Sequence, residues 1–262
     1  LQNNHQVTAI YRNNIDENFK GYGNLKWIRR DLLSVKKDDL EGFDILINLA
    51  CAGVSPQKVS MEELINTNIH APVKLLENSI EAKVKRNIFI GTCHEYGLSA
   101  DNYAFIPVDA PLRPITEYAS IKVSAFHLMR FLSKKNNIQF VYQRVFSAYG
   151  LGQYKGNFWP SLREAALSGN NFSMTEGTQI RDFIAAEDVA FHILNACTRN
   201  DVKNGIPFVM NVGSGKSLSL YEFANKEWIK FNAKGILKKG YIKQRENEIK
   251  CIRPELINLL PP

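Results

Sequence analysis

The sequence contains little cysteine and no long hydrophobic run. Among its 262 residues are four cysteines, at positions 51, 93, 197 and 251, with no CxxC pair. A membrane-spanning helix needs roughly 18 apolar residues in a row, whereas the most apolar stretch, FDILINLACAGV, is shorter and contains Asp44 and Asn48. The first residues show no basic segment followed by an apolar one, the pattern of a signal peptide. These absences predict reduced thiols, a cytoplasmic location and no membrane partner.

The sequence also lacks basic runs interleaved with aromatic residues. Its 33 Lys and Arg residues outnumber its 26 Asp and Glu residues, which gives a formal net charge of +7. Such an excess suits an anionic partner, or simply a solvated surface. Because the basic residues are dispersed, we expect no nucleic-acid binding, and a small phosphorylated ligand fits the charge as well.

Short β-branched runs alternate with longer helical patterns in the first three-fifths of the chain. The patterns predict strands at 5–11, 25–31, 43–50, 86–91, 138–146 and 207–213, and helices at 61–82, 114–135 and 159–168. This alternation indicates a doubly wound α/β fold with a parallel sheet. The apolar character of 43–50 predicts a strand buried on both faces. Pro72 should bend its helix or open the backbone ladder of the helix locally.

The rhythm of the pattern changes after Gly150. We therefore expect a dinucleotide-binding domain over 1–150 and a smaller, mainly substrate-binding lobe over 151–262, from which about 181–213 returns to the first domain. A complete Rossmann-type unit begins with a strand, a Gly-rich turn and a helix. None precedes 5–11, so we expect the first strand and the Gly-rich loop to be missing from this chain.

Two short motifs carry the candidate chemistry. GTCHEYG, at 91–97, follows the strand 86–91, and ligands gather at the carboxyl ends of such strands. YASIK places Tyr118 and Lys122 four residues apart, on one face of a helix. During hydride transfer, a tyrosine can move the proton on a carbonyl oxygen and a lysine can lower the pKa of that tyrosine. A hydroxyl such as that of Thr92 then orients the oxygen.

Other interpretations of these motifs are weaker. A second YxxxK, from Tyr22 to Lys26, lies in a Gly/Asn-rich connection where the spacing does not imply one face. Cys93 and His94 are poorly placed to act as nucleophile and base, because neighbouring side chains of an extended segment point apart. A zinc ion would need further ligands at suitable spacing, and none is visible in the sequence, so we expect no metal.

Several segments match one family in chain order. They are DLLS, INLA, NTNIHAPVKLLE, GTCHEYG, YASIK, RVFSAYGLGQ, GTQIRDFIAAEDVA and MNVGSGKSLSL, from residue 31 to about 220. In these segments the chain resembles the extended short-chain dehydrogenase/reductases, the NAD-dependent epimerase/dehydratase family that acts on nucleotide sugars. The resemblance implies an NAD(P)-dependent enzyme with a nucleotide-diphosphate sugar as substrate. It also implies a homodimer formed through the helix after Asn68 and the helix that bears Tyr118.

The resemblance assigns roles to single residues. The catalytic residues that it implies are Thr92, Tyr118 and Lys122. The cofactor-binding residues that it implies are Tyr11, Arg12, Asp31, Leu32, Leu49, Ala50, Asn68, Lys122 and Arg144. The substrate-binding residues that it implies are His94, Ser147 and Arg181. Arg181 would grip the diphosphate as a bidentate guanidinium; its alternative role is an ion pair with Asp182 or Asp188.

The resemblance also bears on cofactor and reaction. NAD-preferring relatives place an acid where this sequence has Tyr11, followed by Arg12. Because an arginine can pair with a 2′-phosphate, the resemblance favours NADP(H) as the cofactor, with NAD(H) possible. The 4,6-dehydratases carry Asp and Glu directly after the catalytic Thr, where this chain has Cys93 and His94. Dehydration is therefore disfavoured. The TCxEYG form, with Ser147, looks most like enzymes that reduce a 4-keto-6-deoxyhexose; the alternatives are 4-epimerisation and a non-catalytic dinucleotide-binding protein.

Overall fold

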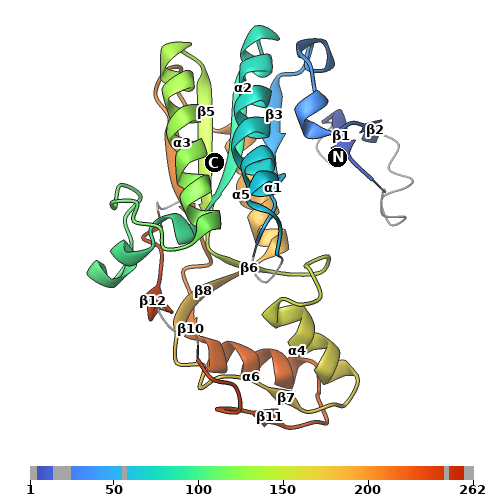
Figure 1. The fold of residues 1–262 in the computed structure, drawn as a ribbon, viewed down its shortest axis with the longest axis vertical. Helices are drawn as coiled ribbons and strands as arrows, with labels where there is room; N and C mark the ends of the chain where they lie inside the picture. The colour runs from blue at the N-terminus through green and yellow to red at the C-terminus, as the bar shows by residue number, and fades with distance from the viewer. Residues whose placement is uncertain (1–4, 14–24, 55–57, 245–247, 257–262) are drawn as a thin grey trace.

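A four-stranded parallel sheet forms the centre of the molecule. The computed structural model describes residues 5–13, 25–54, 58–244 and 248–256. In the order β3-β4-β5-β9, the strands of the main sheet are β3 (Ile45–Asn48), β4 (Arg86–Thr92), β5 (Gln139–Val145) and β9 (Phe208–Val212). The helices α2 (Ala71–Glu81) and α3 (Glu117–Lys135) cover one face, and α5 (Ala186–Thr198) covers the other (Figure 1). The predicted doubly wound α/β fold is confirmed.

Two further strands lie beside this sheet. β1 (Val7–Tyr11) and β2 (Leu25–Arg29) form a separate parallel pair, followed by the short 3-10 helices η2 (Leu32–Ser34) and η3 (Lys37–Asp39). Among the described strands, β3 pairs with β4 alone, and its Ile47 is 38% exposed. The prediction that 43–50 is buried on both faces is therefore wrong, since Phe43 and Leu49 are also exposed, by 37% and 60%.

The helix predicted at 61–82 is divided by a π-helical turn. α1 (Met61–Ile65) runs into the π-turn η4 (Asn66–His70), in which the N–H of Ala71 donates to the carbonyl of Asn66, and α2 follows. Pro72 has no N–H to offer the preceding turn, so the backbone ladder opens just before it, as predicted. The extra residue in the turn carries Asn68 inward, where it is 1% exposed.

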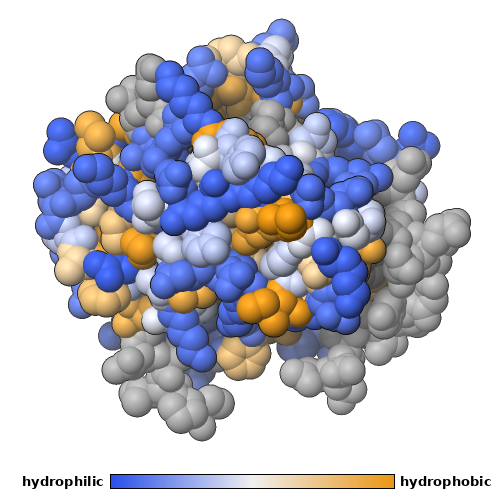
Figure 2. Space-filling model, turned by 90° about the horizontal axis from the view of Figure 1, so that it is seen from below, coloured by the Kyte–Doolittle hydropathy of each residue, from blue (hydrophilic) through white to orange (hydrophobic). Residues whose placement is uncertain are grey.

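The second lobe packs around α4 and α6 at the other end of the molecule (Figure 1). α4 (Phe158–Leu167) and α6 (Leu220–Lys230) enclose an apolar cluster that contains Leu162 and Trp228. Its strands are β6 (Ser147–Tyr149), β7 (Phe172–Ser173), β8 (Ile180–Ala185), β10 (Ser217–Ser219), β11 (Leu237–Lys238) and β12 (Cys251–Ile252). Seen from below, this end shows small hydrophobic patches separated by hydrophilic side chains (Figure 2).

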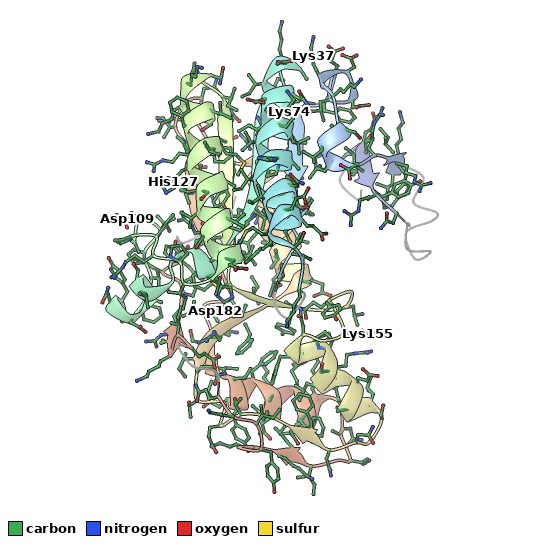
Figure 3. The ribbon with its side chains drawn as sticks, viewed as in Figure 1. Lys37, Lys74, Asp109, His127, Lys155 and Asp182 are labelled. Atoms are coloured by element: carbon green, nitrogen blue, oxygen red, sulfur yellow. The ribbon has the colours of Figure 1, made fainter. Side chains whose placement is uncertain are left out.

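The chain crosses between the lobes at β8 and β9. β8 pairs with β6, β10 and β12, so the return to the main sheet begins at α5 instead of near residue 181. Asp182, near the junction of the lobes in Figure 3, is fully buried and accepts the backbone N–H groups of Ser214 and Gly215 at 2.6 and 2.8 Å. This carboxylate ties the turn after β9 to the second lobe. No helix in the described ranges is long and apolar enough to cross a membrane.

Candidate active site

Thr92 is the last residue of β4 and begins the turn that follows it. Its side chain accepts the N–H of His94, and its own N–H donates to the Glu95 carboxylate at 2.9 Å. These reciprocal bonds cap the 3-10 helix η5 (Cys93–Glu95), which leads into the 3-10 helix η6 (Leu98–Asn102). Capping of this kind satisfies N–H groups that the helix leaves free. The Thr92 side chain is therefore held at the carboxyl end of a central strand.

Tyr118 and Lys122 lie in the first turns of α3, which Thr116 caps. Lys122 is buried, and its Nζ donates to the carbonyl of Ile90 on β4 at 2.6 Å. Tyr118 interacts electrostatically with Cys93 and Glu95, and its hydroxyl is within hydrogen-bonding reach of the Cys51 side chain. The structure thus brings α3 against the strand end that carries Thr92.

The electrostatics of this pair differ from the expectation. Burial, followed by the nearby Cys51, Glu95 and Cys93 groups, raises the pKa of Tyr118 above its ordinary value. Burial lowers the pKa of Lys122, and Glu95 opposes that effect. We expected Lys122 to lower the pKa of Tyr118, but its ammonium donates to a backbone carbonyl and desolvation dominates at the phenol. Desolvation therefore favours the protonated form of Tyr118.

Glu95 belongs to a buried polar cluster that the sequence analysis missed. Its Oε2 accepts from Arg144 Nε at 2.8 Å and its Oε1 from the Tyr142 hydroxyl at 2.8 Å. Arg144 also donates to the hydroxyl of Tyr96 and to the carbonyl of Val108, and it is 2% exposed. The Nε and Nη1 atoms of Arg144 are thus bonded within the protein, and its role at the cofactor stays a prediction. The spacing of Thr92 and Glu95, which is that of a capping box, was the available signal.

Asn68 supports the loop that follows β3. Its amide nitrogen donates to the carbonyls of Ala52 and Leu64, and its carbonyl accepts the N–H of Ala52 at 3.1 Å. The side-chain amide of Asn68 therefore holds the backbone of this loop in place, and its assignment to the cofactor stays a prediction. Leu49 and Ala50, at the start of the loop, are exposed.

Two of the three predicted substrate residues, His94 and Arg181, lie close together at η5. His94 keeps part of its surface exposed, but protein atoms surround much of its side chain. This desolvation, together with the nearby Arg181 guanidinium, lowers the pKa of His94. Arg181 pairs with Glu248 at 3.4 Å, not with Asp182 or Asp188. Ser147 is half-buried at the start of β6.

The predicted cofactor residues near the ends of β1 and β2 are exposed or half-buried. Tyr11 ends β1, Arg12 is exposed after it, and the Arg12 carbonyl accepts from Arg29 Nε. Asp31 caps η2 by accepting the N–H of Leu33, with the half-buried Leu32 between them. Tyr22, the tyrosine of the second YxxxK motif, lies outside the described residues.

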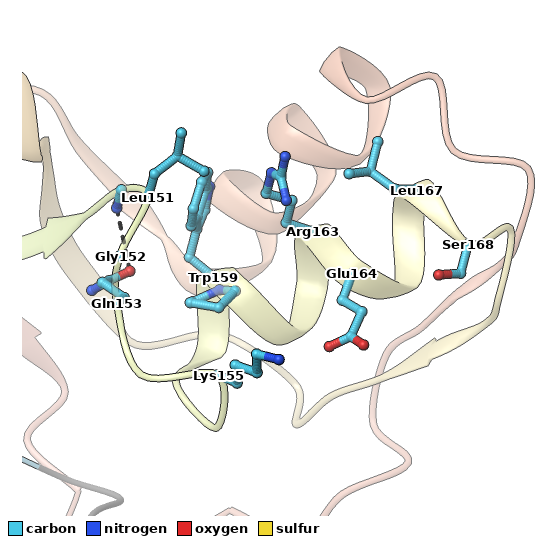
Figure 4. Close-up of a pocket in the computed structure, with 11 residues that line it drawn as sticks. Leu151, Gly152, Gln153, Lys155, Trp159, Arg163, Glu164, Leu167 and Ser168 are labelled. Carbon is cyan, nitrogen blue, oxygen red and sulfur yellow. Dashed lines mark hydrogen bonds between the residues drawn. The ribbon is translucent and has the colours of Figure 1, made fainter. Parts of the chain in front are cut away.

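A surface pocket of about 380 Å³ lies elsewhere, between α4 and the loop that precedes it. Lys155, Arg163 and Trp159 are among its lining residues, drawn in Figure 4. None of the candidate site residues lines it, so it is a separate surface feature. No group of three or more potential metal ligands occurs in the described parts of the chain, and the four cysteines are unpaired.

Comparison with known proteins identifies the class. The model of the NAD dependent epimerase/dehydratase family matches residues 1–213, and the chain belongs to this family. It is therefore an enzyme of the nucleotide-sugar epimerase, dehydratase and reductase group.

Individual relatives are distant. The chain is similar to CDP-abequose synthase of Salmonella typhimurium, with 26% identity over 247 residues, covering 93% of this chain and 79% of the relative. It is 24% identical over 210 residues to UDP-glucose 4-epimerase of Lactobacillus helveticus, covering 71% of this chain and 62% of that protein's length. The fold resembles that of UDP-N-acetylglucosamine 4-epimerase from Methanobrevibacter ruminantium M1 in complex with UDP-N-acetylmuramic acid, with a TM-score of 0.86, 23% identity, and coverage of 97% and 83% of the two chains. It also resembles MoeE5 in complex with UDP-glucuronic acid and NAD, with a TM-score of 0.84, 24% identity and the same coverage.

Proposed function

We propose that this enzyme reduces the 4-keto group of a nucleotide-diphosphate-linked 4-keto-6-deoxyhexose. The observation that carries the proposal is the placement of the half-buried Tyr118 and of Lys122, on α3, against the strand end that bears Thr92. Desolvation raises the pKa of Tyr118, and a protonated phenol is the form that a carbonyl reduction consumes. The neighbours of Thr92 do not offer the acid and base of a dehydratase. Burial raises the pKa of the Cys93 thiol to about 12 and lowers the pKa of His94.

Each residue has one task in this proposal. Thr92 donates a hydrogen bond that orients the carbonyl oxygen, and Tyr118 gives that oxygen its proton as the carbonyl becomes an alcohol. Lys122 keeps a positive charge behind the phenol. Arg181 binds the diphosphate, a task for which a planar guanidinium is well shaped. The nicotinamide cofactor, when bound, supplies the hydride.

The residues present fit a phosphorylated dinucleotide. The Arg12 guanidinium is exposed at the end of β1, and Arg29 lies beside it, so two cations are available to a 2′-phosphate. Lys122 uses one donor on Ile90 and retains others for ribose hydroxyls. We therefore propose NADPH as the preferred cofactor. Replacing Arg12 by Ala should raise the KM for NADPH about two- to fivefold, the contribution of an exposed ion pair, and leave the KM for NADH unchanged. An equal change for both cofactors would contradict this preference.

A second candidate is 4-epimerisation. The likeness in fold to a UDP-N-acetylglucosamine 4-epimerase favours it, whereas the CDP-abequose synthase, which is named for making a CDP-linked sugar, matches more of the chain than the UDP-glucose 4-epimerase does. An epimerase must first remove a proton from a substrate hydroxyl, and a Tyr118 with a raised pKa is a poor base for that step.

The test is NADPH consumption with CDP- and dTDP-linked 4-keto-6-deoxyglucose, followed by NMR of the product. We expect stoichiometric oxidation of NADPH and a 4-hydroxyl in the product. Tyr118→Phe should lower kcat by about 10²–10⁴-fold, while Tyr241→Phe, at a tyrosine that is 73% exposed, should change nothing. Interconversion of UDP-glucose and UDP-galactose without net NADPH use would support the epimerase instead.

We further propose a homodimer through α2 and α3. Phe131 and Leu128, on the outer face of α3, are 63% and 47% exposed, and large apolar side chains at helical spacing suit a helix-to-helix contact. Phe131→Glu should convert a dimer to a monomer in analytical ultracentrifugation. A wild-type monomer would refute this assembly.

A further inference from the structure

The inference concerns Glu95, which no assigned role explains. It is a fully buried carboxylate in η5, three residues after Thr92. A buried charge is costly unless it is paired and hydrogen-bonded. Glu95 meets that condition through Arg144, Tyr142 and the Thr92 N–H, each at 2.8 or 2.9 Å. A structural core alone does not require this arrangement, because well-packed apolar side chains can replace a buried ion pair at little cost.

The carboxylate lies directly against the backbone of β4. A side chain at Gly91 would place its first carbon 2.5 Å from Glu95 Oε1 and against the ring of Tyr142. Gly91 pairs in register with Arg144 on β5, which directs the guanidinium to the same spot. The glycine that opens GTCHEYG is thus needed to admit the carboxylate.

From this position Glu95 acts on each of the three reacting side chains. It holds the N–H of Thr92, which fixes the direction in which that residue leaves the strand. It also interacts electrostatically with Lys122 and with Tyr118. Lys122 Nζ is bonded to Ile90, two residues before Thr92 on the same strand.

We propose that Glu95 is a positioning residue for the reduction: it orients Thr92 by accepting the backbone N–H of that residue, and Lys122 of the same site lies within electrostatic range of its carboxylate. This inference rests on the proposed function for its kinetic consequences. The groups that face Lys122 and Tyr118 from neighbouring elements are Cys51 after β3, Cys93 and Glu95 in η5, and Tyr142 on β5. Of these, Glu95 opposes the burial effect on the Lys122 pKa most strongly, and burial raises the pKa of both Cys93 and Tyr142.

The decisive variant is Glu95→Gln, compared with Tyr142→Phe. Both lose a hydrogen bond in the same cluster, but only the first removes the charge. We expect Glu95→Gln to lower kcat about tenfold with an unchanged KM for the sugar, because Glu95 does not touch substrate. The alkaline limb of its pH–rate profile should move to lower pH, since Lys122 then loses its proton more readily. Tyr142→Phe should keep the wild-type alkaline limb.

A double variant distinguishes a direct effect on the reaction from a loss of folding. In Glu95→Gln/Arg144→Met neither charge remains, so no buried charge is unpaired. It should regain most of the melting temperature lost in Glu95→Gln and still show the lowered alkaline limb. A wild-type pH profile in both Gln variants would overturn the proposal, as would an equal shift in Tyr142→Phe.

Hydrogen exchange separates this inference from the proposed function. In Glu95→Gln, amides of the segment 91–97 should exchange at least about tenfold faster, because the Thr92 N–H loses its charged acceptor. Unchanged exchange would refute the positioning of Thr92, whatever the substrate. If wild-type enzyme reduces no 4-keto sugar while exchange accelerates as expected, the proposed function fails and the backbone role of Glu95 stands.

Discussion

Arg86, at the start of β4, joins the main sheet to the end of α5. It is 9% exposed, and its guanidinium donates to the carbonyls of Ala196, Cys197 and Arg199 at 2.7–2.8 Å and to the side chain of Gln139. The last carbonyls of a helix have no partners within it, and a cation there also opposes the negative end of the helix dipole. We therefore expect Arg86→Met to destabilise the protein without altering the active site directly.

The size of the expected loss in the free energy of unfolding depends on which of the three carbonyls water can reach. A buried acceptor that loses its partner costs about 1–3 kcal/mol, and this full cost falls on Ala196, which is 1% exposed. Cys197 and Arg199 are only partly buried, so water replaces some of what they lose. Together with the dipole contribution of about 0.3–1 kcal/mol, the free energy of unfolding should fall by about 3–4 kcal/mol.

Urea unfolding followed by circular dichroism measures this loss. Arg130→Met, at an exposed arginine on α3, is the matched control and should change the free energy of unfolding by less than about 0.5 kcal/mol. Arg86→Lys should fall between the two, because an ammonium cannot reach all of the acceptors at once. A loss below about 1 kcal/mol in Arg86→Met would refute the reasoning, since the carbonyls would then be satisfied without the guanidinium.

Three other outcomes are expected. Iodoacetamide at pH 8 should label the exposed Cys51 and abolish activity, because the added group crowds Tyr118. Cys93, whose pKa is raised from 9.0 to about 12, should stay unlabelled in the folded protein. Labelling of Cys93 before Cys51 would contradict this expectation. Because burial lowers the pKa of Lys122 from its ordinary 10.5 and raises that of Tyr118 from 10.0, the rate of reduction should fall on the alkaline side through loss of the lysine proton, and Lys122→Met should remove this limb from the profile. Asn68→Leu leaves the N–H and the carbonyl of Ala52, in the loop after β3, without their side-chain partner. The KM for the cofactor should therefore rise about tenfold and the amides of 50–54 should exchange faster, while kcat stays nearly unchanged.

The strand ends that carry the site could be predicted from the sequence because their signals are local. A continuous apolar run marks β4, and the spacing of YASIK on an apolar-periodic segment marks α3. The parallel order of the strands then brings both motifs to one edge of the sheet. The disturbance of the helix near Pro72 could likewise be predicted, because the missing N–H is a property of that one residue.

The partners of buried charges could not be predicted in this way. Arg144 meets Glu95 because Gly91 and Arg144 are in register on β4 and β5, a relation between residues about fifty apart. Arg181 meets Glu248 across a still longer stretch of chain. A linear pattern marks a residue as charged but does not say which neighbour the fold will supply, so the sequence analysis assigned Arg144 to a ligand and gave Glu95 no role.

Transfer of deuterium from labelled NADPH to a CDP- or dTDP-linked 4-keto-6-deoxyglucose tests the central claim most directly. The account predicts one deuterium at C4 of the product for each NADPH oxidised, and a loss of that product in Tyr118→Phe. Absence of deuterium at C4 of either sugar, together with interconversion of C4 epimers of an unoxidised nucleotide sugar, would contradict it.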